Sequence, residues 1–307
     1  MKKWIALAIC CFIALCTFEA AAFPIENDSE SIFSWGQKVN TNRSREDELD
    51  QAQEEMNWPL GPVGRFPLGD VNYSLAQSFT PQKKVLTRVE LYIERNGTTT
   101  YPYVVAIRDD LFGEDLTRIS VPSTQVEIEN FSWVEFDFTD IKLTVNQTYW
   151  IVSYTANETE NWYLWGLNLS DPYPCGEVAA SIDDGKTWET NDTVDLCFRT
   201  YGRNEYNLEI SLPRISFGVA VNFGNGEEFD LVNLTYEITI EGGLLGLINT
   251  TIGGDIGNIP SRLFIGFNIP VFGLGPISVS ITVDDITIIT NAFVIGFLVI
   301  QVGIPPT

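Results

Sequence analysis

The chain has 307 residues, with 41 acidic against 18 basic side chains, a formal net charge of −23 and no histidine. The lack of histidine excludes imidazole-based acid–base catalysis, Ser-His-Asp and Cys-His nucleophiles, and metal sites that need imidazole. The negative charge repels phosphate backbones and no basic stripe occurs, so we expect no nucleic-acid partner. Hydrophobic residues make up 45% of the chain, which is enough to bury a core, and the length suggests about two domains.

The N-terminus has the pattern of a secretory signal peptide. Lys2 and Lys3 precede an apolar run over residues 4–15, and three alanines follow at 20–22. The apolar run is shorter than the ~20 residues that span a bilayer. The pattern predicts removal of residues 1–22 and a secreted, extracellular or cell-surface protein; an uncleaved N-terminal anchor is the alternative.

Two cysteines remain after that removal, Cys175 and Cys197. An even count in an exported chain predicts one disulfide, which would close a loop of about 23 residues and stabilise the fold by roughly 3 kcal/mol. The alternative is two free thiols in a redox or metal role, which lacks CxxC spacing.

The chain is rich in acceptor sequences for N-glycosylation, Asn-x-Ser/Thr. Composition alone predicts about three under the sequon rule. The excess indicates an N-glycosylated exported protein of an archaeal or eukaryotic envelope, although the abundance of Asn and Thr in β-turns explains part of it. The eleven acceptors are Asn27, Asn42, Asn72, Asn96, Asn130, Asn146, Asn157, Asn168, Asn191, Asn233 and Asn249.

Residues 23–69 are polar, acidic and interrupted by prolines. Residues 44–56 within them have a capping serine and acids in the first turn, which predicts one short helix. Few apolar residues are available to bury, so the segment is expected to be a solvated linker or stalk.

Residues 70–203 show short runs of alternating apolar and polar residues, separated by turn residues every 8 to 12 positions. In the run 133–138, for example, Val134, Phe136 and Phe138 alternate with acids. This period of two predicts an all-β domain, a jelly-roll-like sandwich.

Residues 204–307 contain about seven further strand-like runs, which predicts an immunoglobulin-like β-sandwich. The last apolar run, 293–300, is expected to be a buried strand. The alternative is a strand that pairs with another chain, which would give self-association through the C-terminal strand.

One motif predicts a tight hairpin. Residues 181–188 read Ser-Ile-Asp-Asp-Gly-Lys-Thr-Trp and resemble the Asp-box, S-x-D-x-G-x-T-W, which is structural in the families that carry it, including sialidases. The defined positions are Ser181, Asp183, Gly185, Thr187 and Trp188.

Two clusters are candidates for binding. Four carboxylates, Asp109, Asp110, Glu114 and Asp115, follow a strand-like run and form a candidate calcium site, without EF-hand spacing; the same groups are the weaker candidates for a glycosidase pair. Four aromatic residues form a candidate sugar-stacking platform, with core packing as the alternative. They are Trp162, Tyr163, Trp165 and Tyr173.

The chain also resembles a recurrent module of exported archaeal surface proteins over residues 49–202. The resemblance rests on Gln-Ser-Phe-Thr-Pro at 77–81, Arg-Asp-Asp-Leu at 108–111, the run 133–138, the Asp-box, and Asp-Leu-Cys-Phe-Arg-Thr-Tyr-Gly at 195–202. With Phe-Gly-Val-Ala-Val at 217–221 and Glu-Gly-Gly-Leu-Leu at 241–245 as the matching points, the second block resembles the Ig-like domain that often follows this module. That family has no assigned catalysis, so the resemblance implies a non-enzymatic surface protein.

Together these observations predict a secreted, N-glycosylated, non-catalytic cell-surface protein with a structural or adhesive role, without cofactor unless calcium binds. Its expected partners are other envelope proteins or glycans. The runner-up is a carbohydrate-binding protein that uses the aromatic platform, and an enzyme is the third class.

Overall fold

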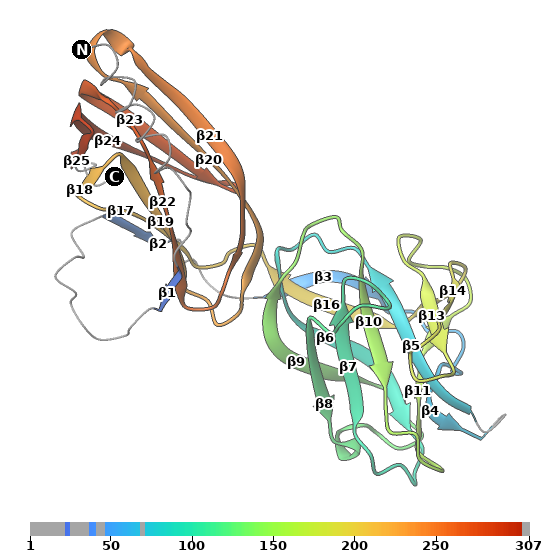
Figure 1. The fold of residues 1–307 in the computed structure, drawn as a ribbon. Helices are drawn as coiled ribbons and strands as arrows, with labels where there is room; N and C mark the ends of the chain where they lie inside the picture. Colours follow the sequence, from blue (N-terminus) through green and yellow to red (C-terminus); the bar gives the residue numbers. More distant parts are fainter. Residues whose placement is uncertain (1–21, 25–36, 41–46, 68–70, 303–307) are drawn as a thin grey trace. The chain divides into compact units, whose positions relative to one another are not determined.

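The computed structural model describes residues 22–24, 37–40, 47–67 and 71–302 (Figure 1). Within them the chain is all-β, with antiparallel sheets and two short 3-10 turns, η1 (Ser123–Gln125) and η2 (Leu244–Gly246). The predicted all-β, sandwich-like fold is therefore confirmed. The finer jelly-roll-like and immunoglobulin-like assignments stay predictions. No helix among the described residues has the length and hydrophobicity to cross a membrane.

The chain forms two compact units. The central unit comprises Arg43–Tyr206, and the terminal unit combines Met1–Asn42 with Asn207–Thr307. The expected signal peptide, 1–22, lies outside the described residues except for its last position.

The central unit holds strands β3 to β16. Their bounds are β3 (Glu48–Gln53), β4 (Pro62–Phe66), β5 (Val71–Phe79), β6 (Val85–Arg95), β7 (Tyr103–Arg108), β8 (Thr117–Val121), β9 (Ser132–Lys142), β10 (Tyr149–Tyr154), β11 (Trp162–Trp165), β12 (Leu167–Asn168), β13 (Val178–Ser181), β14 (Glu189–Asn191), β15 (Asp195–Leu196) and β16 (Phe198–Arg203). Strand β6 lies between β9 and β16, while β10 lies between β5 and β7, and β4 joins the two groups by pairing with both β11 and β5.

The alternation read from the sequence places the core of this unit. On β9, Val134, Phe136 and Phe138 are buried while Glu135 and Asp137 are exposed. The buried side chains join one apolar cluster with residues of β5, β6, β7, β10 and β11. Because successive side chains of a strand point to opposite faces, one face of each sheet supplies the core and the other faces outward.

Much of the segment expected to be a linker belongs to the sheets. Strand β3 pairs with β16, and β4 pairs with β11 and β5. The expectation of a short helix over 44–56 is wrong, since 48–53 is a strand; residues 44–46 lie outside the described residues. The physical reason is that edge strands are stabilised largely by backbone pairing, which a count of apolar residues does not detect.

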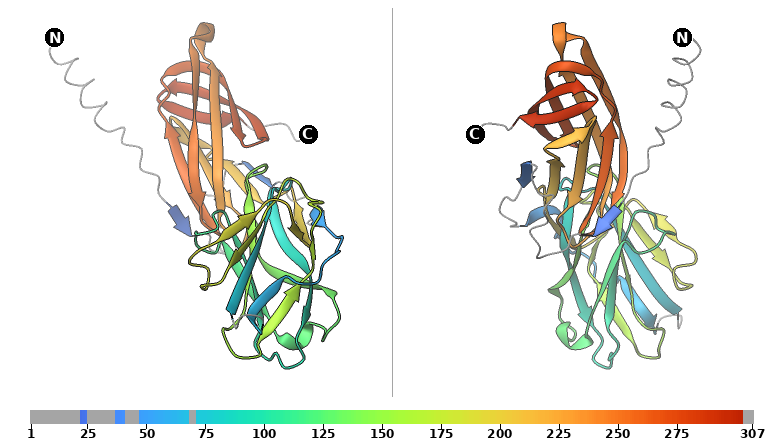
Figure 2. Two further views of the ribbon diagram at one scale, coloured as in Figure 1. Left: turned by 90° about the vertical axis from the view of Figure 1, so that its right-hand side faces the viewer. Right: turned by 60° about the vertical axis from the view of Figure 1, so that its left-hand side comes forward.

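The terminal unit contains a five-stranded and a six-stranded sheet (Figure 2). The five-stranded sheet has the order β1-β22-β19-β17-β2, and the six-stranded sheet has the order β18-β25-β24-β23-β20-β21. Their bounds are β1 (Ala22–Pro24), β2 (Gln37–Asn40), β17 (Leu208–Leu212), β18 (Ile215–Phe217), β19 (Val219–Asn225), β20 (Leu231–Gly242), β21 (Ile248–Ile259), β22 (Leu263–Ile269), β23 (Gly273–Val283), β24 (Ile286–Gly296) and β25 (Leu298–Val302).

The last apolar run, 293–300, is two strands and not one. It contains the end of β24 and the start of β25, joined where Gly296 has a φ of 64°. A glycine adopts this left-handed conformation without a steric penalty, which permits the tight turn. Strand β24 pairs with β23 on one side and β25 on the other, so its backbone offers no free edge to another chain.

Candidate functional site

The Asp-box forms the tight hairpin between β13 and β14. The Asp183 carboxylate accepts hydrogen bonds from the Thr187 backbone N–H and hydroxyl, both at 2.8 Å, and from the Ser181 hydroxyl at 2.9 Å. The backbone N–H of Gly185, where φ is 77°, donates to the Ser181 Oγ at 2.9 Å. The hairpin predicted from these residues is therefore present.

These hydrogen bonds determine the charge state of the hairpin. The backbone N–H and hydroxyl of Thr187 stabilise the ionised form of Asp183 and lower the pKa of its carboxyl. At neutral pH the carboxylate is therefore charged and acts as the acceptor that closes the turn.

Trp188 connects the hairpin to the outer face of the sheet formed by β5, β10 and β7. Its indole N–H donates to the Gly185 carbonyl oxygen at 3.1 Å. Its ring packs against a small apolar cluster that is separate from the main core and includes Ala76, Trp150 and Val152. These are the outward-facing members of their strands, so the alternation that buries the core also builds a second apolar layer beneath the hairpin.

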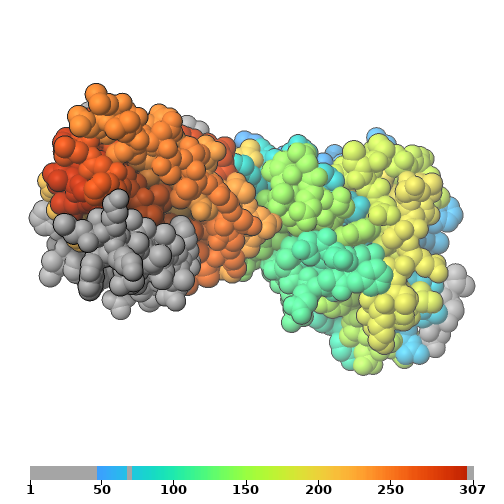
Figure 3. All heavy atoms as spheres, turned by 45° about the horizontal axis from the view of Figure 1, so that its top comes forward, coloured from blue at the N-terminus to red at the C-terminus, as the bar shows by residue number. Residues whose placement is uncertain are grey.

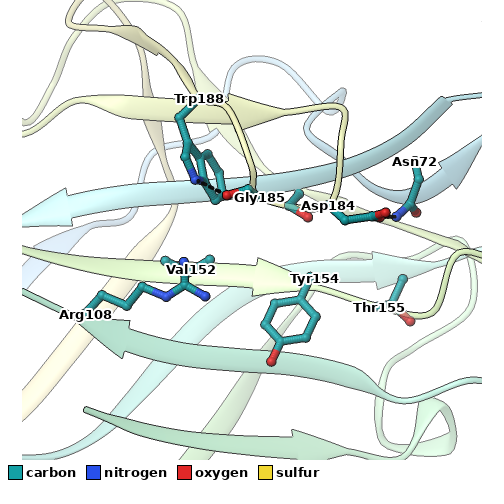
Figure 4. A pocket seen from close by; sticks show the side chains of 9 residues that line it. Asn72, Arg108, Val152, Tyr154, Thr155, Asp184, Gly185 and Trp188 are labelled. Atoms are coloured by element: carbon teal, nitrogen blue, oxygen red, sulfur yellow. Dashed lines mark hydrogen bonds between the residues drawn. The ribbon is translucent and has the colours of Figure 1, made fainter. Parts of the chain in front are cut away.

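A pocket of about 130 Å³ lies between the hairpin and the outer face of that sheet (Figure 4). A cavity smaller than the ~300 Å³ of typical drug-sized sites suits a ligand about as large as one sugar ring. Its lining comes from β5, β7, β10 and the hairpin, and the residues are Asn72, Ser74, Arg108, Val152, Tyr154, Thr155, Asp184, Gly185 and Trp188.

The pocket offers both hydrogen-bond donors and acceptors. The Asn72 Nδ2 donates to the Asp184 Oδ1 at 2.7 Å, while the Asn72 Oδ1 is buried and has no partner among the described residues. Arg108 is held by its Nε to the Asp115 Oδ1 at 2.7 Å and by its Nη1 to the Leu111 carbonyl oxygen. The polar groups of this lining therefore include an amide, a carboxylate and a guanidinium.

The expected aromatic platform is wrong. Tyr163 and Trp165 are fully buried, and the Trp165 indole N–H donates to the Cys197 carbonyl oxygen at 2.7 Å. Trp162 packs edge-to-face on Phe66, with ring centroids 5.0 Å apart, and the Tyr173 ring packs in the same way on Phe198. The short strand β11 has neighbours on both edges, β4 and β6. Tyr163 and Trp165 pack inside the unit, while Trp162 and Tyr173 are half-buried against other rings, so the four residues form no shared exposed platform.

The four carboxylates of the candidate calcium site do not converge. Asp115 is paired with Arg108, and Asp110 accepts the Phe112 backbone N–H at 2.8 Å. Among the described residues no group of three or more acidic or cysteine side chains is arranged to hold a metal ion. The physical reason is local, because an arginine on the preceding strand and a turn N–H take the oxygens that a cation would need. Asp109 and Glu114, the other two carboxylates of the candidate calcium site, belong to no such group either.

The expected disulfide is also wrong, since Cys175 is an exposed free thiol and Cys197 is a buried one. Leu196 and Phe198 belong to the main core, so alternation turns Cys197 to the opposite face. There its Sγ accepts a hydrogen bond from the Gln53 Nε2 at 3.5 Å. Burial raises the pKa of Cys197 to about 12, which keeps it a protonated, unreactive thiol.

The predicted glycan acceptors differ in exposure. Asn72 and Asn168 are buried and use their Nδ2 atoms in hydrogen bonds, the latter to the Glu55 carbonyl oxygen at 3.0 Å. Asn96 is half-buried, and Asn27 and Asn42 lie outside the described residues. The remaining acceptors are exposed, namely Asn130, Asn146, Asn157, Asn191, Asn233 and Asn249.

Sequence reasoning assigned the pocket residues to other roles. In the sequence Asn72 stands out only as a glycan acceptor, and Arg108 only as the first residue of the Arg-Asp-Asp-Leu motif at 108–111. One signal was available: β10 reads Tyr-Trp-Ile-Val-Ser-Tyr, so an aromatic residue faces outward at Trp150 and at Tyr154. The sequence did not show that β13 pairs with β5, which places the hairpin next to these residues.

No protein-family model matches the chain, and no curated protein matches its sequence. Among solved structures the chain is similar to a calcium-binding mutant of beta-glucuronidase 2 from Bacteroides uniformis, with 10% sequence identity and a TM-score of 0.19. The similarity covers 84% of this chain and 32% of that chain. Because the TM-score is low, this similarity contributes nothing to the assignment of the pocket, which rests on its own geometry.

Proposed function

We propose that the protein is an exported, N-glycosylated, non-catalytic surface protein with an adhesive role, and that the pocket beside the Asp-box holds a sugar. The observation that carries the proposal is the small pocket itself, which combines an amide, a carboxylate and a guanidinium with an indole and a phenol.

The chemistry of the pocket fits a carbohydrate. Sugar hydroxyls both donate and accept hydrogen bonds, and Asp184 supplies acceptors while Arg108 supplies donors. The Trp188 and Tyr154 rings supply apolar surface for the C–H face of a sugar ring. The pocket has room for one sugar unit at the end of a glycan, with the rest of the glycan in solvent.

Export and glycosylation are supported by the signal-like N-terminus and by the exposed acceptors on both units. The pocket adds a restriction, because Asn72 is buried in its lining and a glycan on the Asn72 Nδ2 would have to occupy that space. We expect Asn72 and Asn168 to be unmodified in native material while exposed acceptors carry glycans. Peptide mapping by mass spectrometry measures this, and a glycan on Asn72 would contradict the assignment of the pocket.

The binding test uses a panel of monosaccharides, comprising glucose, galactose, mannose, N-acetylglucosamine and glucuronate, with saturation-transfer NMR on the full chain. We expect at least one to bind with millimolar affinity, as is typical of a small, shallow site; each lost hydrogen bond costs about tenfold or less. Binding by none of the panel at about ten times that concentration would contradict the proposal.

Two variants locate the bound sugar. Tyr154→Phe removes only a hydroxyl that has no hydrogen bond among the described residues, and Trp188→Ala removes the indole. The matched controls, Tyr101→Phe and Trp58→Ala, change exposed aromatic residues of the same unit away from the pocket. We expect binding to weaken in the first pair only. Equal loss in the control pair would place the sugar elsewhere.

A further inference from the structure

The outer face of the six-stranded sheet in the terminal unit is apolar over four neighbouring strands. Directly opposite residues of antiparallel strands point to the same face, so the strand register defines two rows across β18, β25, β24 and β23. The first row is Phe217, Leu298, Ile295 and Leu274, and the second is Ile215, Ile300, Phe293 and Pro276. We call these eight residues, with Ile289 and Val302, the apolar face.

The apolar face is open to solvent. Phe217 is 76% exposed, Ile215 60% and Ile295 50%. The residues between them point inward, where Val294, Ile277 and Val299 are buried. The sheet therefore has apolar side chains on both faces, and Figure 3 shows residues toward the end of the described chain (red) at the surface of the terminal unit.

The same four strands carry no charged side chain. They contain 30 residues, all uncharged, in a chain of which 19% is charged. They also contain no glycan acceptor, whereas the neighbouring strands β20 and β21 carry Asn233 and Asn249. A surface that lacks charge and glycan acceptors together has the composition of the centre of a protein interface.

The size of the apolar face matches one half of a stable interface. Seven of its large apolar side chains are more than a third exposed. At roughly 100 Å² of accessible surface each, they present about 700 Å² of apolar surface to solvent. A standard interface takes about 800 Å² from each partner, whereas exposed apolar patches on monomers rarely exceed a few hundred Å².

The charge of the protein indicates which partner fits. A second copy carries the same net charge of −23, so two copies that met through most other surfaces would bring carboxylates together. Two apolar faces meet without that repulsion and are self-complementary, as a twofold interface requires. A lipid surface fits less well, because the face has no lysine or arginine to attract headgroups.

We propose that two copies of this chain associate through the apolar face, packing sheet against sheet. This inference is independent of the sugar pocket, which lies in the central unit. It differs from strand addition, since β24 and β25 already have partners on both edges.

Sedimentation velocity on the full chain over a concentration series tests the proposal. We expect a dimer with a dissociation constant in the micromolar range or below, and no weakening when salt is added, because the face has no ion pairs. Ile295→Glu places a carboxylate in the face, and Phe217→Ser removes its most exposed ring; each is expected to raise the dissociation constant about tenfold or more. Unchanged melting temperatures at low concentration confirm that the variants fold.

The matched control is Phe112→Ser, which removes an equally exposed phenylalanine (68%) from the central unit and should leave the dimer intact. Flotation with vesicles of phosphatidylcholine and phosphatidylglycerol tests lipid as the alternative occupant. If the wild-type protein is a monomer at every concentration in the sedimentation series, the proposal is overturned. This holds whether or not the protein binds vesicles in the flotation assay. A dimer that survives both face variants, or that Phe112→Ser dissociates, overturns it too.

Discussion

The two units have inner faces of the same kind and outer faces of opposite kinds. In the central unit, outward positions carry charge: Arg88 forms ion pairs with Asp47 at 2.9 Å and Glu135 at 3.0 Å. Arg199 contacts Glu54 and lies 4.0 Å from the centre of the Trp133 ring. In the terminal unit, the equivalent outward positions of β23, β24 and β25 are uncharged and largely apolar.

This difference separates what stabilises a sandwich from what a sandwich binds. Stability comes mainly from burying the inner faces, since exposed ion pairs contribute about 1 kcal/mol or less each. The outer faces are free to differ. In the central unit the charged face remains solvated, and the proposed ligand site is a pocket. In the terminal unit the apolar face is the proposed surface for a second copy of the chain.

The largest expected effect tests whether the two units are stabilised independently. Trp165→Ala removes a fully buried indole and its hydrogen bond to the Cys197 carbonyl oxygen, which we expect to cost about 3–5 kcal/mol. Differential scanning calorimetry should show a lower transition for the central unit only.

Phe223→Ala, at a fully buried position of the terminal unit, is the reciprocal control and should lower the other transition. If either variant lowered both transitions equally, the units would unfold as one.

A smaller effect distinguishes the two faces of a single strand. Val294 is fully buried and its neighbour Ile295 is half exposed. Val294→Ser should destabilise by about 2 kcal/mol or more, because it leaves a cavity and buries a hydroxyl. Ile295→Ser should stay within about 0.5 kcal/mol in the monomer. Urea unfolding at low protein concentration measures both, and equal costs would show that the outer face is part of the core.

The smallest effect concerns the pH dependence of the Asp-box hairpin. The pKa of Asp183 is lowered in the folded state, first by the hydrogen bonds from Thr187. The carboxylate therefore stabilises the fold above the ordinary aspartate pKa of about 3.9, and this contribution is lost as pH falls through the lower, folded pKa.

Melting temperatures of wild type and Asp183→Asn should consequently differ at neutral pH and converge in acid. Asp195 supplies a contrast of opposite sign, because burial raises the pKa of its carboxyl although the Tyr173 backbone N–H partly offsets this. Its ionisation destabilises the fold as pH rises from the unfolded pKa through the raised folded one. NMR titration that placed the Asp183 pKa above that of Asp195 would contradict at least one of the two assignments.

Parts of the structure were readable from local pattern. The alternation at Val134, Phe136 and Phe138 predicted an outward and an inward face, and the Asp-box predicted a hairpin. Strands β3 and β4 were not readable: they look like a polar linker because backbone pairing, not apolar content, holds them in place. The pairing of Cys175 with Cys197 failed because spacing and parity say nothing about which face a side chain occupies.

Local sequence patterns were enough to predict the all-β class, the period-two cores and the hairpin at 181–188, because these depend on neighbours within a few residues. Where outward side chains gather depends on contacts between strands that are distant in the sequence. Asn72, Arg108, Tyr154 and Asp184 meet in one pocket because strands distant in sequence pair and a hairpin folds over them. The apolar face likewise exists because register aligns the apolar rows of β18, β25, β24 and β23, and register is a property of the whole sheet.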